Sequence, residues 1–242
     1  MNRGILPTAG ARELTVRAAH LVLLRHGESV WNSADRFGGW VDIPLTAHGL
    51  RQAADAGRTL AQAGLVPTVL HTSELRRAID TASEVARVTG GRPATRRSWR
   101  LNERHYGAWQ GRGRRDVLAE VGEEHFTEVR RGWSARPPEG GPRSGGEFPE
   151  LRRAGVTAES LADVWTRLQP YWHESITRDL TTDAVVLVVA HGNSLRALVR
   201  HLDGLDEAEL GSFELTVGRP RMYRFDRTDG ADGHPQAVRT VT

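Results

Sequence analysis

Residues 21–32 read LVLLRHGESVWN, in which four apolar residues are followed at once by an arginine, a histidine and a glycine. A short continuous apolar run before a polar turn is typical of a buried parallel strand that feeds a loop. Residues 185–190 (VVLVVA) repeat this pattern and are followed by the turn HGNS at 191–194. Because ligands in open α/β sheets bind outside the carboxyl ends of the strands, the two His-Gly turns predict one binding site formed by both.

Helical and extended patterns alternate along the rest of the chain. We expect helices at 46–63, at 73–90, at 159–178 and from 195 to about 203, and strands at 21–24, 69–71, 94–98, 185–190, 213–217 and 221–225. This alternation predicts an α/β fold, a three-layer α/β/α sandwich with a mostly parallel central sheet. Residues 100–115 are polar and interrupted by glycine, which favours a site-forming loop, and PPEGGPRSGG at 137–146 favours a mobile loop.

One catalytic domain is expected over residues 20–226, with a disordered leader at 1–19 and a poorly ordered tail at 227–242. The leader lacks the apolar stretch of a secretory signal. No apolar run in the sequence approaches the roughly 18 residues that cross a bilayer. We therefore expect a cytoplasmic protein without a membrane partner.

The composition excludes several kinds of chemistry. All 33 basic side chains are arginine, and cysteine is absent. A lysine Schiff base, a P-loop lysine, a cysteine nucleophile and a thiolate metal site are thereby excluded. The net charge is only +3, and the arginines are mixed with 30 acidic residues. A nucleic-acid binder would concentrate its basic residues on one element, so no nucleic-acid partner is expected.

Two histidines brought together are compatible with either a metal site or a phosphate site. The chain has no HExxH sequence and no cysteine, which makes a zinc site the weaker interpretation. Arg25 directly precedes His26, and a fixed cation at that point favours an anionic substrate. Arginine also forms bidentate contacts with phosphate and carboxylate groups. We therefore expect a phosphate-binding site in preference to a zinc site.

Five segments together resemble the phosphoglycerate mutase branch of the histidine phosphatase superfamily. The first is residues 21–32, with its RHG motif, and the others are RFGGWVD at 36–42, TSELRRAI at 72–79, SWRLNERHYGAWQG at 98–111 and AHGNSLRALV at 190–199. A weaker match is ESLADVWTRLQPY at 159–171, and the similarity extends from about residue 20 to residue 225. RHG alone marks the superfamily, whereas LNERHYG together with HGNSLRAL is specific for the mutases that use 2,3-bisphosphoglycerate.

The resemblance implies the fold of that family and an isomerase reaction. It implies interconversion of 3-phosphoglycerate and 2-phosphoglycerate, in glycolysis and gluconeogenesis, by phosphoryl transfer through a phosphohistidine. It also implies that 2,3-bisphosphoglycerate primes the enzyme, that no metal takes part and that phosphoglycerate is the small-molecule partner. It leaves open a homo-oligomer, either a dimer or a tetramer.

The resemblance also implies roles for individual residues. His26 corresponds to the nucleophile, Glu103 to the general acid and base, and the groups around the transferring phosphoryl correspond to Arg25, Arg77 and His191. Residues expected to contact the substrate are Asn32, Gly38, Gly39, Tyr106, Arg114, Arg130, Arg131, Gly192 and Asn193.

The chain departs from the family pattern in three places, and these departures keep an alternative activity open. Gly38 stands where the mutases usually carry threonine, and Arg114 stands where they usually carry lysine. The segment at 137–158 is short and the C-terminal tail is altered, so the pocket is expected to close less fully. The alternative is a phosphatase of the same superfamily acting on small phosphate esters. A catalytically silent phosphate-binding relative is a third reading, against which the intact set of catalytic residues argues.

Overall fold

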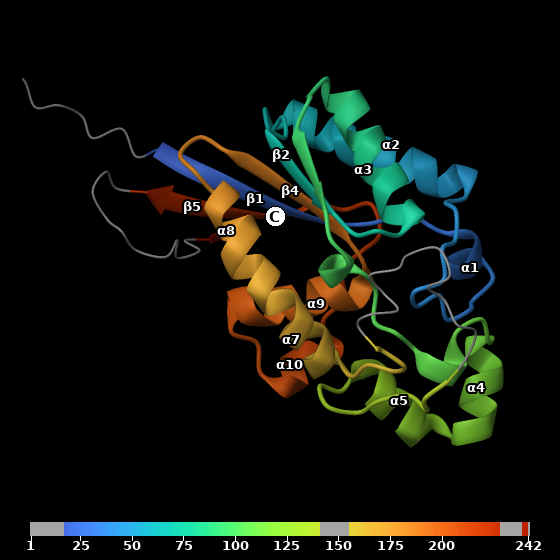
Figure 1. The fold of residues 1–242 in the computed structure, drawn as a ribbon. Coiled ribbons are helices and arrows are strands. Elements are labelled where there is room, and N and C mark those ends of the chain that lie inside the picture. The colour runs from blue at the N-terminus through green and yellow to red at the C-terminus, as the bar shows by residue number, and fades with distance from the viewer. Residues whose placement is uncertain (1–16, 141–154, 228–238, 242) are drawn as a thin grey trace, which may run out of the picture.

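The computed structural model describes residues 17–140, 155–227 and 239–241, which form a central sheet covered by helices on both faces (Figure 1). In this part of the chain the sheet has six strands in the order β3-β2-β4-β1-β5-β6. Strands β1 to β4 run parallel, whereas β5 is antiparallel to β1 and β6 to β5. The mostly parallel sheet is therefore confirmed. The strands are β1 (Arg17–Arg25), β2 (Val69–Thr72), β3 (Ala94–Arg97), β4 (Val185–Ala190), β5 (Arg221–Arg227) and β6 (Arg239–Val241).

The two faces of the sheet bury separate hydrophobic clusters. Along β1, Leu21 and Leu23 belong to one cluster, and Val22 and Leu24 belong to the other. Successive side chains of a strand point to opposite faces, so one apolar run supplies both layers. Figure 1 shows the helices α2 (Ala47–Gln62) and α3 (Arg76–Thr89) on one face, with α7 (Leu161–Tyr171) and α9 (Gly192–Asp203) on the other. The three-layer sandwich expected from the sequence is confirmed.

Local cap chemistry explains where the helices begin and end. Thr46 accepts a hydrogen bond from the backbone N–H of Gly49 and starts α2, as expected. Gly90 ends α3 in the left-handed conformation, with φ of 70°. The expected start of this helix at Ser73 is wrong, because α3 begins three residues later at Arg76. The Ser73 hydroxyl instead accepts a hydrogen bond from Leu75 N–H, which forms a turn before the helix.

The helix expected at 159–178 consists of three consecutive pieces. They are α7, the π-helical turn η3 (Trp172–Ile176) and α8 (Thr177–Asp179). Ser160 caps the first piece by accepting from Asp163 N–H, so the helix begins at Leu161. Pro170 lies inside α7, and a proline cannot donate the helical hydrogen bond of its position. The π-helical turn follows directly after this interruption.

Shorter elements surround the carboxyl ends of the parallel strands. The loop expected at 100–115 overlaps two single 3₁₀ turns, η1 (Trp99–Leu101) and η2 (Gly107–Trp109). Four short helices complete the described part of the chain: α1 (Val30–Ser33), α4 (Arg114–Val121), α5 (Glu123–Arg131) and α10 (Glu207–Ser212). The strand expected at 213–217 is wrong. Phe213 is the C-cap of α10, and the Leu215 carbonyl accepts a hydrogen bond from the Arg25 side chain instead of pairing with a strand.

Several expectations fall outside the described residues. The leader at 1–19 is described only from residue 17, and most of the loop expected at 137–146 is not described.

In the tail, β5 continues to Arg227 and Arg239–Val241 forms β6. None of the helices in the described part of the chain has the length and apolar character that a membrane span requires.

Two glycines allow the loop after β1 to touch the start of α2. A Cβ atom on Gly27 would lie 2.2 Å from the carbonyl oxygen of Gly49, which is backbone and cannot move aside. We expect Gly27→Ala to lower the free energy of unfolding by about 1–3 kcal/mol, the usual cost of overpacking. Urea denaturation measures this change. Gly211→Ala is the control, because no atom lies within 4 Å of the added carbon in α10, and it should leave stability unchanged or raised.

Candidate active site

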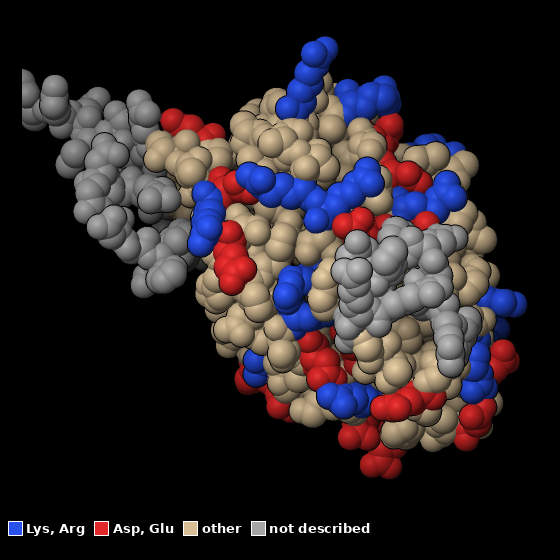
Figure 2. All heavy atoms as spheres, in the orientation of Figure 1, with Lys and Arg blue, Asp and Glu red and all other residues tan. Residues whose placement is uncertain are grey.

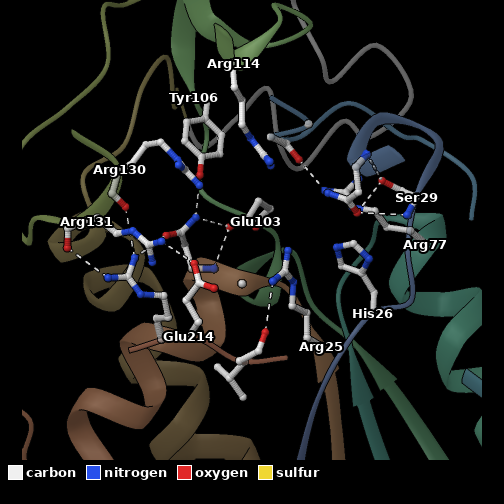
Figure 3. A pocket seen from close by; sticks show the side chains of 17 residues that line it. Arg25, His26, Ser29, Arg77, Glu103, Tyr106, Arg114, Arg130, Arg131 and Glu214 are labelled. Atoms are coloured by element: carbon white, nitrogen blue, oxygen red, sulfur yellow. Dashed lines mark hydrogen bonds and ion pairs between the residues drawn. The ribbon is translucent and has the colours of Figure 1, made fainter. Parts of the chain in front are cut away.

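One cavity of about 260 Å³ lies beyond the carboxyl ends of β1 and β4 (Figure 3). Thirteen of the fourteen site residues expected from the sequence line it: Arg25, His26, Asn32, Gly38, Gly39, Arg77, Glu103, Tyr106, Arg114, Arg130, Arg131, Gly192 and Asn193. The remaining residue, His191, is fully buried, and its ring centroid lies 4.9 Å from that of His26. The structure therefore brings together residues that are up to 168 positions apart in the sequence.

His26 follows β1 and is held as a neutral imidazole. Its Nδ1 lies 2.6 Å from the carbonyl oxygen of Gly27, so the Nδ1–H donates to this carbonyl and Nε2 keeps its lone pair. Burial lowers the pKa of His26 well below its ordinary value, and the nearby cations Arg77 and Arg25 lower it further. A neutral ring with a fixed tautomer has the form that a nucleophile requires.

His191 follows β4 and is also held neutral. Its Nε2 lies 2.7 Å from the hydroxyl oxygen of Ser73. The same hydroxyl oxygen also accepts from the backbone N–H of Leu75, so the turn before α3 holds the His191 ring in place. The His191 ring lies entirely out of contact with solvent. Burial, followed by the charge of Arg77, lowers the pKa of His191 well below its ordinary value.

Two arginines place cations beside the histidines. Arg77 is buried and donates to the carbonyl oxygens of Val41 (2.8 Å) and Gly39 (2.7 Å), so it ties down the loop that lines the cavity. Burial lowers the pKa of Arg77 to about 10, which still leaves it charged at neutral pH. Arg25 donates to the carbonyl oxygen of Leu215 (3.2 Å), and its buried Nε has no protein partner among the described residues. Unsatisfied buried donors of this kind are expected where an anion binds.

Glu103 is held in the wall by contacts to one of its carboxylate oxygens. Its Oε1 accepts from the backbone N–H of Arg104 (2.8 Å), the backbone N–H of Asn193 (3.1 Å) and the Asn193 side-chain amide (3.0 Å). These three bonds leave Oε2 as the oxygen that can exchange a proton. The Glu103 carbonyl accepts from the Trp40 indole (2.5 Å) and from Arg167 (3.0 Å), so the backbone of this residue is also fixed.

Arg167 belongs to a buried ion pair behind the loop that carries Glu103. Its Nε lies 2.6 Å from Glu159, and both side chains are almost fully buried. The same guanidinium group donates to the carbonyl oxygens of Arg100 (2.6 Å) and Asn102 (2.9 Å). One arginine therefore satisfies several carbonyls of the segment that leads from η1 to Glu103.

The far end of the cavity carries a second group of cations. Arg130 and Arg131 lie in the last turn of α5, and Figure 3 shows both across the cavity from His26. Arg130 packs over the ring of Phe126, with its guanidinium carbon 5.3 Å from the ring centroid, and burial lowers its pKa. The cavity thus has one cationic end at His26 and another at α5.

Glycines leave room between these groups. A Cβ atom on Gly192 would lie 3.7 Å from both the Arg25 guanidinium group and Glu103 Oε2, so a side chain there would enter the space between them. A Cβ atom on Gly38 would make only ordinary contacts, with Ile43 at 3.4 Å and with the Arg77 guanidinium group at 4.0 Å. The space and the unsatisfied donors fit a bound phosphoryl group.

Four further residues line the cavity that the sequence did not indicate: Ser29, Arg196, Glu214 and Leu215. Ser29 donates to Asn32 Oδ1, which leaves the Asn32 amide N–H groups to face an anion. Arg196 donates to Asn193 Oδ1 (3.1 Å) and to the carbonyl of Arg131 (3.1 Å). Arg196 lies inside the HGNSLRAL segment, so the sequence could have indicated it as a residue of the site.

Outside the cavity, basic and acidic side chains are mixed on the surface (Figure 2). On the face seen in Figure 2, the arginines are interspersed with aspartate and glutamate and do not form one continuous basic patch. Within the described ranges, no three or more histidine, aspartate or glutamate side chains are grouped so that they could hold a metal ion.

The neutral histidines make stability depend on pH. Below pH of about 6.5 the unfolded chain protonates its histidines, whereas His26 and His191 stay neutral in the fold. Stability should therefore fall as pH is lowered through this range, by up to about 1.4 kcal/mol per pH unit for each histidine. We expect His26→Gln to reduce the pH dependence of the free energy of unfolding by up to about 1.4 kcal/mol per pH unit. Urea denaturation between pH 7.5 and 5.5 measures this dependence. His71, whose pKa is about 4, contributes equally to the wild type and to the variant. The same pH dependence in both proteins would contradict the neutral state assigned to His26.

Comparisons with known proteins agree with this geometry. The model of the histidine phosphatase superfamily (branch 1) matches residues 21–231. A relative from Clavibacter michiganensis subsp. michiganensis, named 2,3-bisphosphoglycerate-dependent phosphoglycerate mutase, is 46% identical over 214 residues, with 85% of each chain covered. A relative of the same name from Thermobifida fusca is 43% identical, with 90% of this chain and 94% of the relative covered.

Solved structures show the same fold at lower identity. Mycobacterial hydrolase 1 superposes with a TM-score of 0.74 at 26% identity, covering 93% of this chain and 97% of that one. A mycobacterial glucosyl-3-phosphoglycerate phosphatase superposes with a TM-score of 0.68 at 27% identity, covering 86% and 91%. The chain therefore belongs to branch 1 of the histidine phosphatase superfamily and, within it, to the family of 2,3-bisphosphoglycerate-dependent phosphoglycerate mutases.

Proposed function

We propose that this protein interconverts 3-phosphoglycerate and 2-phosphoglycerate through a phosphohistidine on His26. The observation that carries the proposal is the cavity with two cationic ends, one around the neutral His26 and one at Arg130 and Arg131 (Figure 3). A phosphoglycerate has two anionic ends, and Arg side chains bind both carboxylate and phosphate well. The sequence identity to relatives named as such mutases supports the same activity.

The residues at the first end suit phosphoryl transfer. In the first half-reaction, His26 Nε2 attacks the phosphorus while the bond to the substrate oxygen breaks and Glu103 gives a proton to that oxygen. In the second half-reaction, Glu103 takes the proton of the accepting hydroxyl, which forms its bond to phosphorus as the bond to His26 breaks. The charge on the three equatorial oxygens would be stabilised by Arg25, Arg77 and the His191 ring.

The cavity also fits the priming group that the family name implies. When bound, 2,3-bisphosphoglycerate supplies the phosphoryl group that first loads His26. Arg25 and Arg77 would hold its reacting phosphate, while Arg130 and Arg131 would hold the opposite end. Independence of metal ions, a cytoplasmic location and a role in glycolysis and gluconeogenesis belong to the same proposal, as does assembly into a dimer or tetramer.

A second candidate is hydrolysis, in which water takes the phosphoryl group from His26. Two observations favour it: Gly38 provides no hydroxyl where it lines the cavity, and both solved structures described above are named as a hydrolase or a phosphatase. Loss of one substrate hydrogen bond costs about 0.5–1.5 kcal/mol, which is enough to change the partition between glycerate and water several-fold.

Incubation with 3-phosphoglycerate, with and without 2,3-bisphosphoglycerate, tests both candidates. We expect 2-phosphoglycerate to form faster with the bisphosphate present and to exceed the free phosphate released. His26→Ala should abolish both products and the acid-labile phosphoenzyme, because Nε2 of His26 forms the covalent bond. Phosphoenzyme on the variant at the wild-type level would contradict the assignment, and phosphate as the main product would establish the phosphatase instead.

The far end of the cavity predicts a selective effect on substrate binding. Arg130→Ala should raise the KM for phosphoglycerate about ten-fold or more, which is the effect of losing a charge-assisted hydrogen bond. The KM for a small phosphate monoester should change much less. Only a substrate with a second anionic end contacts this arginine. Arg200→Ala is the matched control, since Arg200 stacks on Trp133 and is not part of the cavity wall. Equal effects of Arg130→Ala on both substrates would place this residue outside the distal binding site.

A further inference from the structure

The Asn193 side chain lies between two groups of the cavity wall, and its orientation decides what each of them meets. Its Nδ2 donates to Glu103 Oε1 (3.0 Å) and to the Tyr106 hydroxyl oxygen (2.9 Å). Its Oδ1 accepts from Arg196 Nη1 (3.1 Å). A half-turn of the amide would set its oxygen against the Glu103 carboxylate and its NH₂ group against the guanidinium group of Arg196, so both contacts would become repulsive.

Arg196 is the group that sets this orientation. It lies on α9, one turn after Asn193, and is only 5% exposed. Burial lowers the pKa of Arg196 to about 10, which leaves the side chain charged at neutral pH. Its acceptors are the Asn193 amide oxygen and backbone carbonyls, none of which carries a full charge. Burying a cation against uncharged acceptors is costly, which points to a role that a neutral side chain cannot fill.

Two other helices hold the Arg196 guanidinium group in place. Its Nη2 donates to the carbonyl oxygens of Arg131 (3.1 Å), at the end of α5, and of Leu210 (2.7 Å), in α10. Its Nη1 also lies 3.3 Å from the carbonyl oxygen of Arg130. Both terminal nitrogens are thus engaged by the protein, so the group cannot turn toward a substrate without leaving buried carbonyls unsatisfied. The amide of Asn193 therefore has a fixed partner.

The other oxygen of Glu103 faces the reacting end of the cavity. A Cβ atom on Gly192 would lie 3.7 Å both from Glu103 Oε2 and from the Arg25 guanidinium group. We propose that Arg196 is a positioning residue that acts through the Asn193 amide to keep Glu103 Oε2 directed at the leaving oxygen. A carboxyl group free to rotate would present its proton there only part of the time. This inference rests on the proposed function, in which Glu103 protonates that oxygen.

The choice of leaving group separates this role from a merely structural one. The alcohol of benzyl phosphate needs a proton to leave, whereas p-nitrophenyl phosphate releases a stabilised phenolate that does not. Both esters lack a second anionic end, so the distal arginines do not distinguish them. We expect Arg196→Met to lower kcat/KM for benzyl phosphate about ten-fold more than that for p-nitrophenyl phosphate. An equal loss with both esters would overturn the inference, because a partly unfolded enzyme cleaves both less.

A double-mutant cycle tests whether Arg196 acts through Asn193. In an Asn193→Leu background, Arg196→Met should not change the ratio of the two kcat/KM values further, because the amide is gone. A further change of about ten-fold would overturn the inference. Arg200→Met is the matched control and should leave the ratio unchanged, since Arg200 lies one turn later on α9 and stacks on Trp133 outside the cavity wall. If Arg196→Met does not fold, Arg196→Lys, which keeps the charge on a single nitrogen, should change the ratio in the same direction by less.

The orientation of the amide is also measured without turnover. The chain has four asparagines, so selective ¹⁵N labelling gives four pairs of side-chain NMR signals, and Asn193→Leu identifies the pair that belongs to Asn193. We expect Arg196→Met to shift this pair and Arg200→Met to leave it in place, and an unmoved pair in Arg196→Met would overturn the inference. If the wild type forms no phosphoenzyme but the pair shifts, the proposed function fails while Arg196 still positions the amide. If the wild type forms phosphoenzyme and the ratio of the two esters is unchanged in Arg196→Met, the inference fails and the proposed function stands.

Discussion

The ladder of hydrogen bonds between β1 and β4 sets Arg25 opposite Ala190, and this register places the residues that follow the two strands, His26 and His191, side by side. Parallel strands end at the same edge of a sheet, so the two imidazoles enter one buried space. Burial there removes water from both rings and keeps them neutral beside two cations. A slip of one residue would turn His26 to the other face of the sheet and separate the pair.

Around this fixed pair, the site is assembled from loops that buried polar groups hold in place. Arg167 and Glu159 form an ion pair that also satisfies the carbonyls of the loop around Glu103. Arg77 does the same for the loop at Gly39 while remaining part of the cavity wall. Such networks are costly to leave half satisfied, which makes the loops rigid without regular secondary structure. The acid–base group and the phosphate-binding cations are thereby preorganised, as electrostatic catalysis requires.

Local signals in the sequence predicted those parts of the fold that depend on local chemistry. The apolar runs identified β1 and β4, and Thr46 marked the start of α2, because strand burial and capping are properties of neighbouring residues. The site residues came from segments whose spacing resembles a known family. Glu214 was missed, because its place in the wall depends on the distant contact of the next residue with Arg25, and its segment was expected to be a strand. Helix α5 was also missed, since only Phe126 and Val129 of its nine residues are buried.

The position of β1 in the sheet has a consequence for how the protein acquires its structure during synthesis. This first strand pairs on one side with β4 and on the other with β5, which follow it by some 160 and 200 residues. At roughly 5–20 residues per second, the ribosome needs about eight to thirty seconds to supply β4 after β1. During that time the apolar strand has neither neighbour, and loops of this length close slowly. Completion of the sheet, and with it the meeting of His26 and His191, therefore awaits the synthesis of β4 and β5.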